Sequence, residues 1–169
     1  MKPARLIALA LFAGLPATAS AQVLGEDACV GGASAILVQV VGLKDRRGEL
    51  KLELYPANEQ DFLRDDRDLL REGKLFRRIR VPTPTAGDVR LCMRVPRPGR
   101  YALLLTHNRD GKNKFNFWVD GAGFASTQKL GRKRPRLHQA IVDVPAGVQR
   151  ITVRAQYLRG FSGFGPVKS

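Results

Sequence analysis

The sequence has few of the residues from which proteins build metal centres. Its 169 residues include two cysteines and two histidines. Cys29 and Cys92 lie far apart in the chain, without the closely spaced ligand pairs that zinc sites use. A site on His107 and His138 would need both to meet beside a carboxylate, and the sequence offers no such constellation. We therefore expect no metal and no cofactor.

Catalytic motifs are equally scarce. Ser126 follows Gly-Phe-Ala but lacks the G-x-S-x-G frame of a nucleophile elbow. The carboxylate pair Asp65 and Asp66 lies in a segment where arginines balance the acids, so nothing there raises a carboxyl pKa for acid-base chemistry. These absences predict a non-enzymatic protein without a catalytic residue.

Long apolar runs are missing too. The run from Leu6 to Leu15 is about half as long as the roughly 20 residues that a helix needs to cross a bilayer. Lys2 and Arg5 precede this run, and the small residues 19–21 follow it, an order typical of a secretory signal peptide. We expect a signal peptide at residues 1–21, cleavage before Gln22, and a periplasmic or secreted protein without a transmembrane segment.

Acidic residues are outnumbered about two to one. The chain has 29 Lys and Arg against 15 Asp and Glu, a formal net charge of +14 at pH 7. Such an excess bears on solubility and on the charge of partners rather than on the fold. Segment 74–100 has a single acid, and none lies between Asp120 and Asp143. The latter interval holds a cluster of five bases: Lys129, Arg132, Lys133, Arg134 and Arg136.

The two cysteines both lie in the part expected to be exported. In an oxidising compartment an even number of cysteines favours a disulfide, here between Cys29 and Cys92. The alternative is a pair of buried free thiols. Cys92 shares a strand face with Arg90 and Arg94, so we expect the bond on the outer or edge side of its strand.

Strand-like patterns dominate the rest of the chain. Residues 35–43 form a β-branched apolar run, and residues 49–55 alternate leucines with Glu49, Lys51 and Glu53. Period two with one polar face predicts a half-buried strand, and we expect these two segments to form a hairpin. Further strands are predicted over 75–81, 88–95, 100–107, 139–144 and 149–157, the last two as a second hairpin.

About seven short strands separated by Gly and Pro turns, without long helices between them, predict a mainly β fold, a single antiparallel β-sandwich. A short helical turn is expected near 62–71. The expected organisation is an N-terminal segment at 22–33 with Cys29, the sandwich at 34–158, and a C-terminal tail at 159–169. The tail is expected to be loose, or to dock through Phe161 and Phe164.

Several ordered motifs resemble a secreted bacterial family known as domain of unknown function 2141. The chain shares its early cysteine, its cysteine strand, a Pro-x-Pro-Gly-x-Tyr-Ala-Leu segment at 96–103 and a glycine-phenylalanine element at 121–126. The similarity spans residues 29–157. The resemblance implies a transthyretin-like or prealbumin-like sandwich, and it implies no activity, catalytic residue or ligand.

The resemblance also identifies a loop that begins at His107. Family members carry oxygen-rich side chains here, in an arrangement like a calcium loop. In this chain amides replace the expected acids, and Arg109 and two lysines leave the loop with a net positive charge. A hydrogen-bonded turn is therefore favoured over a calcium site. The family loop residues are His107, Asn108, Asp110, Gly111, Asn113 and Asn116.

Three hypotheses for function remain. The five-base cluster favours an envelope module that binds anionic lipid, lipopolysaccharide or acidic polysaccharide. A structural domain without a ligand is the equal alternative. Nucleic-acid binding ranks below both, because an exported protein rarely meets nucleic acid, although Phe115, Phe117 and Trp118 beside lysines resemble a stacking platform. Otherwise these aromatics belong to the core or anchor their loop.

Overall fold

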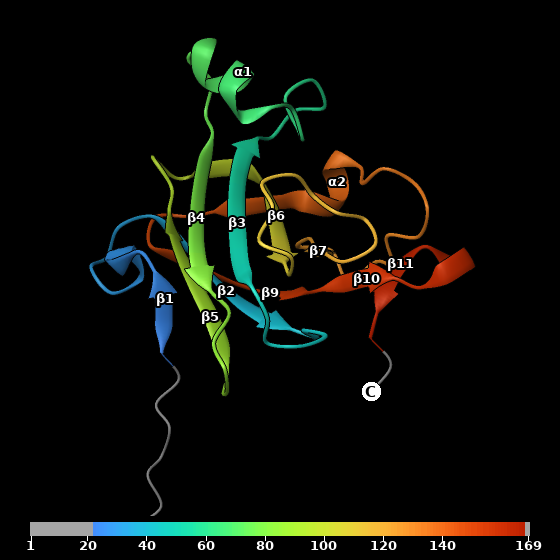
Figure 1. Ribbon diagram of the computed structural model, residues 1–169. Coiled ribbons are helices and arrows are strands. Elements are labelled where there is room, and N and C mark those ends of the chain that lie inside the picture. Colours follow the sequence, from blue (N-terminus) through green and yellow to red (C-terminus); the bar gives the residue numbers. More distant parts are fainter. Residues whose placement is uncertain (1–21, 168–169) are drawn as a thin grey trace, which may run out of the picture.

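Two β-sheets organise residues 22–167, the part of the chain that the computed structural model describes (Figure 1). The smaller sheet has the strand order β1 (Val23–Gly25), β5 (Val89–Arg94), β2 (Ala35–Val41) and β9 (Val148–Arg154). The larger sheet has the order β11 (Phe164–Pro166), β10 (Gln156–Leu158), β7 (Gly121–Gly123), β6 (Gly99–Asn108), β3 (Glu49–Pro56) and β4 (Arg77–Pro82), with β8 (Ile141–Val144) also paired to β6. The predicted mainly β class is confirmed. The signal peptide expected at 1–21 lies outside the described residues.

The core lies between the two sheets, and β3 and β4 lie in front of β2 and β5 in Figure 1. Alternate residues of each strand face this core because a strand turns successive side chains to opposite faces. Leu50, Leu52 and Leu54 of β3 are fully buried there. They pack with residues from both sheets, including Ile36, Val38, Leu91, Met93, Leu103 and Leu105.

The predicted disulfide is confirmed. Cys29 ends the short 3-10 helix η1 (Asp27–Cys29) and is bonded to Cys92 of β5, with the two Cα atoms 5.9 Å apart. Cys92 is buried on the side of the smaller sheet that faces away from the core, among Ala28, Ala35 and Leu37. The bond therefore fixes the N-terminal segment onto the outer side of this sheet, where the alternation of β5 had placed it.

Both predicted hairpins are wrong. Strand β2 pairs with β5 and β9 in the smaller sheet, whereas β3 pairs with β4 and β6 in the larger one. Residues 42–48 between them span the two sheets, a longer connection than the tight turns that close most hairpins. In the same way, β8 pairs with β6 and β9 with β2. The β1–β5 and β2–β9 pairs are parallel, so the sheets are mixed rather than purely antiparallel.

Residues 22–167 form eleven strands instead of about seven. Strands β1, β7 and β11 have three residues each, too few for alternation to reveal, and the strand predicted over 149–157 is divided into β9 of the smaller sheet and β10 of the larger one. Part of the expected tail is one of these strands. The helical turn near 62–71 forms as α1 (Asp66–Arg71), capped by the Asp65 carboxylate, which accepts the Arg67 N–H. A second short helix, α2 (Leu137–Ala140), precedes β8, and η2 (Gly160–Ser162) precedes β11. No helix of the described residues is long and apolar enough to span a bilayer.

Candidate ligand-binding pocket

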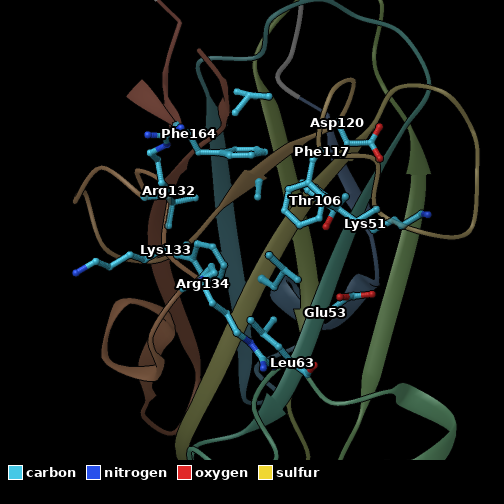
Figure 2. Close-up of a pocket in the computed structure, with 18 of the residues that line it drawn as sticks. Lys51, Glu53, Leu63, Thr106, Phe117, Asp120, Arg132, Lys133, Arg134 and Phe164 are labelled. Atoms are coloured by element: carbon cyan, nitrogen blue, oxygen red, sulfur yellow. Dashed lines mark hydrogen bonds between the residues drawn. The ribbon is translucent and has the colours of Figure 1, made fainter. Parts of the chain in front are cut away.

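The outer face of the larger sheet forms the floor of a pocket of about 1130 Å³. Figure 2 shows Lys51, Glu53 and Thr106 rising from the two central strands of this sheet toward the pocket. Leu104 of β6 and Ala122 of β7 complete the apolar part of the floor. Along β3 and β6 these residues alternate with the leucines of the core. One face of each strand therefore packs in the core, and the other face lines the pocket.

The walls of the pocket come from segments that connect or follow the strands. One wall is the loop 109–119 between β6 and β7, which contributes an aromatic cluster with β11. The ring centroids of Phe115 and Phe117 are 5.2 Å apart, and that of Phe164 lies 5.9 and 6.2 Å from them. Phe124 lies deeper and is 2% exposed. The opposite wall is the loop 124–136, which carries the basic residues.

Hydrogen bonds of acidic and amide side chains hold the aromatic loop in place. The buried Asp120 carboxylate accepts the backbone N–H groups of Arg109 at 2.8 Å and Asn116 at 2.9 Å. The Asp110 carboxylate accepts the side-chain amide of Asn116 at 2.9 Å and the backbone N–H of Lys112 at 3.0 Å. These bonds lower the pKa of Asp110. The loop thus has the hydrogen-bonded Asx geometry expected from its sequence.

Beyond this loop, Asn108 donates to the Glu49 carboxylate at 2.8 Å. The Arg109 guanidinium is ion-paired with Asp45 and donates to the Val119 carbonyl at 2.7 Å. Within the described residues, no group of three His, Cys, Asp or Glu side chains has an arrangement that holds a metal ion.

His107 links three segments below the pocket and is fully buried. Its Nε2 atom is 2.8 Å from the Arg47 carbonyl, and its Nδ1 atom is 2.6 Å from the Tyr157 hydroxyl. Since a carbonyl only accepts, Nε2 carries the proton and Nδ1 accepts from Tyr157, whose oxygen accepts the Lys44 N–H. Burial lowers the pKa of His107. These bonds tie His107 to the loop 42–48 and to β10 rather than to the loop that follows it.

Three of the five clustered bases line the pocket: Arg132, Lys133 and Arg134. Two backbone bonds of 2.8 and 2.6 Å between Gly131 and Phe164 attach their loop to β11. Figure 2 shows Arg134 extending toward Leu63, whose carbonyl oxygen accepts from Nη2 at 3.4 Å, while Lys133 points away from the sheet. The other two bases lie elsewhere, since Lys129 lies over Gly165 of β11 and Arg136 precedes α2.

The charged groups around Glu53 are paired with one another. Glu53 accepts from Arg78 Nε at 2.6 Å and from the Tyr55 hydroxyl at 2.9 Å, and Arg78 also pairs with Asp66 at 2.8 Å. Burial, with the neighbouring Glu53 carboxylate, raises the pKa of Tyr55 far above its usual value, so the phenol keeps its proton. Lys51 is paired with Glu49 at 3.3 Å.

Arg132, Lys133 and Arg134 take no part in this network of ion pairs. Among the described residues no carboxylate lies within 4.0 Å of the charged groups of Arg132, Lys133 or Arg134. The pocket thus combines a floor that is apolar around Leu104 and Ala122 with three bases along one side that no carboxylate of the described residues pairs. This arrangement suits a ligand with an apolar body and an anionic group.

Sequence reasoning placed two parts of this site incorrectly. Lys51 and Glu53 were expected on a solvated face, yet they are 5% and 7% exposed because the surrounding loops cover them. Phe117 and Trp118 were expected in a core or anchoring a loop, yet they are 65% and 83% exposed. The contribution of Phe164 and of the outer face of β6 was missed. The sequence carried one signal for this face of β6: Leu104 is apolar, although it occupies a position on the polar side of its strand.

A family model described as "Uncharacterized protein conserved in bacteria (DUF2141)" matches residues 38–152, which confirms the resemblance seen in the sequence. The match includes the pocket floor on β3, β6 and β7 and both loops that form its walls. Strands β10 and β11, and with them Phe164, lie outside it. Comparison with curated proteins and with solved structures gave no match.

Proposed function

The chain belongs to the bacterial family DUF2141, whose description assigns no activity, and we propose that it is an exported, non-enzymatic protein that binds an anionic lipid. The acyl chain of the lipid lies on the apolar floor of the pocket, and its headgroup meets the basic side of the mouth. In this proposal the two sheets form a transthyretin-like sandwich that serves as the scaffold for the pocket.

The observation that carries this proposal is the joining of two surfaces in one cavity. Leu104, Ala122 and Phe124 provide an apolar floor, and burial of acyl methylenes against it gives a non-directional attraction. Arg132 and Arg134 provide guanidinium groups, whose planar donors match phosphate and carboxylate oxygens. A lipid with an anionic headgroup satisfies both surfaces at once.

The other anionic partners considered fit less well. A polysaccharide can stack sugar rings on the exposed aromatic side chains, but its hydroxyl groups find no hydrogen-bond partner on the side chains of Leu104, Ala122 and Phe124. A structural domain without a ligand would leave a large apolar concavity open to water, and exposed apolar patches of this kind mark binding sites in most proteins. An anionic lipid therefore fits the pocket better than a polysaccharide does, and better than the absence of a ligand.

Export is supported by the signal-peptide pattern of the sequence together with the disulfide. A bond between Cys29 and Cys92 persists in oxidising compartments and is rare in the cytosol. An exported protein meets anionic lipids in the cell envelope, which is consistent with the proposed ligand. We therefore place the protein in the periplasm or outside the cell.

The proposal is tested by titrating the purified protein with lysophosphatidylglycerol below its micelle concentration, using calorimetry. The variant Arg132→Glu/Arg134→Glu should bind this lipid at least about tenfold more weakly, because it loses charge-assisted bonds to the headgroup. The uncharged monoacylglycerol with the same acyl chain should bind both proteins alike.

The matched control is Arg97→Glu/Arg150→Glu, which makes the same change in net charge outside the pocket. This control should bind lysophosphatidylglycerol as the wild type does. Equal weakening in both double variants would mean that net charge, and not the pocket, determines binding. Absence of binding by the wild type would refute the proposal itself.

A further inference from the structure

Three large apolar side chains that line the pocket are strongly exposed. Phe117 and Trp118 of the loop 109–119 are 65% and 83% exposed, and Phe161 of η2 is 92% exposed. All three line the same pocket, although they come from segments about forty residues apart in the chain. We call these three residues the aromatic tip.

The aromatic tip is held in a fixed position. The ring of Phe117 contacts Phe115 and Phe164 edge-on, at centroid distances of 5.2 and 6.2 Å. Phe164 is held by its two backbone bonds to Gly131, and Gly163 beside it approaches Gly131 so closely that a Cβ would lie 2.2 Å from the carbonyl oxygen. The exposed rings therefore project from two anchored segments.

Bases lie on the loop that carries Phe117 and Trp118 and on the loop bonded to β11. Lys112 and Lys114 belong to the aromatic loop, and Arg132 and Lys133 belong to the loop that is bonded to β11. Of these four bases, only Lys112 has a paired acid among the described residues. Asp120 is buried, and Asp110 is engaged by Asn116 and by both nitrogens of Lys112.

We infer that the aromatic tip docks on the surface of an anionic bilayer. Tryptophan and phenylalanine side chains partition into the headgroup region of membranes, and each base near an anionic surface adds to the attraction. A second copy of this chain fits the same surface poorly, because pairing two copies would bring their bases together. The occupant that matches both the rings and the charges is a bilayer rich in anionic lipid.

Docking in this way has a consequence for the pocket, which rests on the proposed function. Because the aromatic tip and Arg132 line the mouth, the docked protein would hold that mouth against the lipid headgroups. A lipid could then pass between bilayer and pocket with its acyl chain away from water. The tip and the pocket thus form two parts of one lipid-handling surface.

Trp118 is the single tryptophan of the chain, so its fluorescence reports directly on the docking surface. The full protein is mixed with vesicles of phosphatidylglycerol and phosphatidylcholine, and with vesicles of phosphatidylcholine alone. The anionic vesicles should shift the emission to the blue, and lipids brominated near the headgroup should quench it. High salt should weaken the effect, because the bases are exposed.

The variant Phe117→Ser/Phe161→Ser keeps the reporter and should partition into anionic vesicles at least about tenfold more weakly, since two large apolar side chains are removed. Leu70→Ser on α1 is the matched control, because Leu70 is 57% exposed away from the pocket, and it should partition like the wild type. Circular dichroism confirms that each variant is folded.

Two outcomes would overturn the inference: unshifted, unquenched Trp118 emission with anionic vesicles, or equal partitioning by the double variant and the wild type. A Trp118 response to a single-stranded oligonucleotide but not to vesicles would assign the surface to nucleic acid instead. Titration with the lysolipid and docking on vesicles are read separately. Wild-type protein that binds lysophosphatidylglycerol without docking refutes only the docking, and docking without lysolipid binding refutes only the proposed function.

Discussion

The length of the bound acyl chain should control the affinity of the pocket. A series of lysophosphatidylglycerols that differ only in chain length keeps the headgroup contacts constant and changes only the apolar contact. Each methylene that is fully buried contributes about 0.8 kcal/mol, or roughly a fourfold change in Kd. The buried Phe124 and the floor residues Leu104 and Ala122 offer such burial.

Methylenes near the mouth should contribute less. Phe117 and Trp118 are 65% and 83% exposed, so a chain segment beside them keeps part of its surface in water. If half of that surface is buried, each methylene contributes about 0.4 kcal/mol, or roughly a factor of two. Extending the chain by four methylenes should therefore tighten binding by roughly 15- to 200-fold.

Isothermal calorimetry below the micelle concentration of each lipid measures this dependence. The same series with Leu104→Asn should give a shallower dependence, because an amide on the floor replaces an apolar contact. A Kd that does not change with chain length would show that the pocket recognises only the headgroup. That result would refute the assignment of the apolar floor to an acyl chain.

Three further predictions concern the scaffold. The double variant Cys29→Ser/Cys92→Ser should lose about 4 kcal/mol of unfolding free energy in urea melts, since the bond closes a loop of 63 residues in the unfolded chain. Burial lowers the pKa of His107 from 6.5, so its contribution to unfolding free energy is complete above pH 6.5 and is lost as the pH falls through the folded value. Urea melts at several pH values should show this loss, and it should be smaller in His107→Gln. Gly48→Ala should lower the unfolding free energy by more than about 2 kcal/mol, because its φ is +66° and a Cβ would lie 2.0 Å from a carbonyl oxygen of β6. Gly111→Ala, where φ is +72° and the space is open, should lower it by about 1 to 2 kcal/mol.

The strands themselves were predictable because alternation is a local property. Leu50, Leu52 and Leu54 repeat every second residue, and this pattern places them on one face whatever the partner strand is. Pairing is not local. Strand β2 could have paired with β3 by proximity in the sequence, yet its parallel partner β9 lies more than a hundred residues away. The choice depends on how residues 42–48 cross between the sheets, and alternation carries no information about that path.

The pocket was harder to predict because its cover comes from distant segments. Lys51 and Glu53 have the spacing of a solvated strand face, and only the loops 109–119 and 124–136 make that face concave. The bases of Arg132 to Arg134 were visible as a cluster, but their position opposite an aromatic wall depends on the Gly131–Phe164 bonds. Phe164 looked like a tail residue, since a three-residue strand has no period to detect.

The distribution of charge within the pocket also fixes the orientation of an amphiphilic ligand. At one end Glu53, Arg78 and Asp66 form a closed network, and an anion placed there would meet two carboxylates for one guanidinium. On the loop bonded to β11, Arg132 and Lys133 have no carboxylate within 4.0 Å among the described residues, whereas Arg134 extends toward Leu63 (Figure 2). In the proposed complex an anionic headgroup is attracted to Arg132 rather than to the first end, and the acyl chain runs from there over the floor. This orientation places the headgroup beside the aromatic tip, where a docked protein would exchange it with a bilayer.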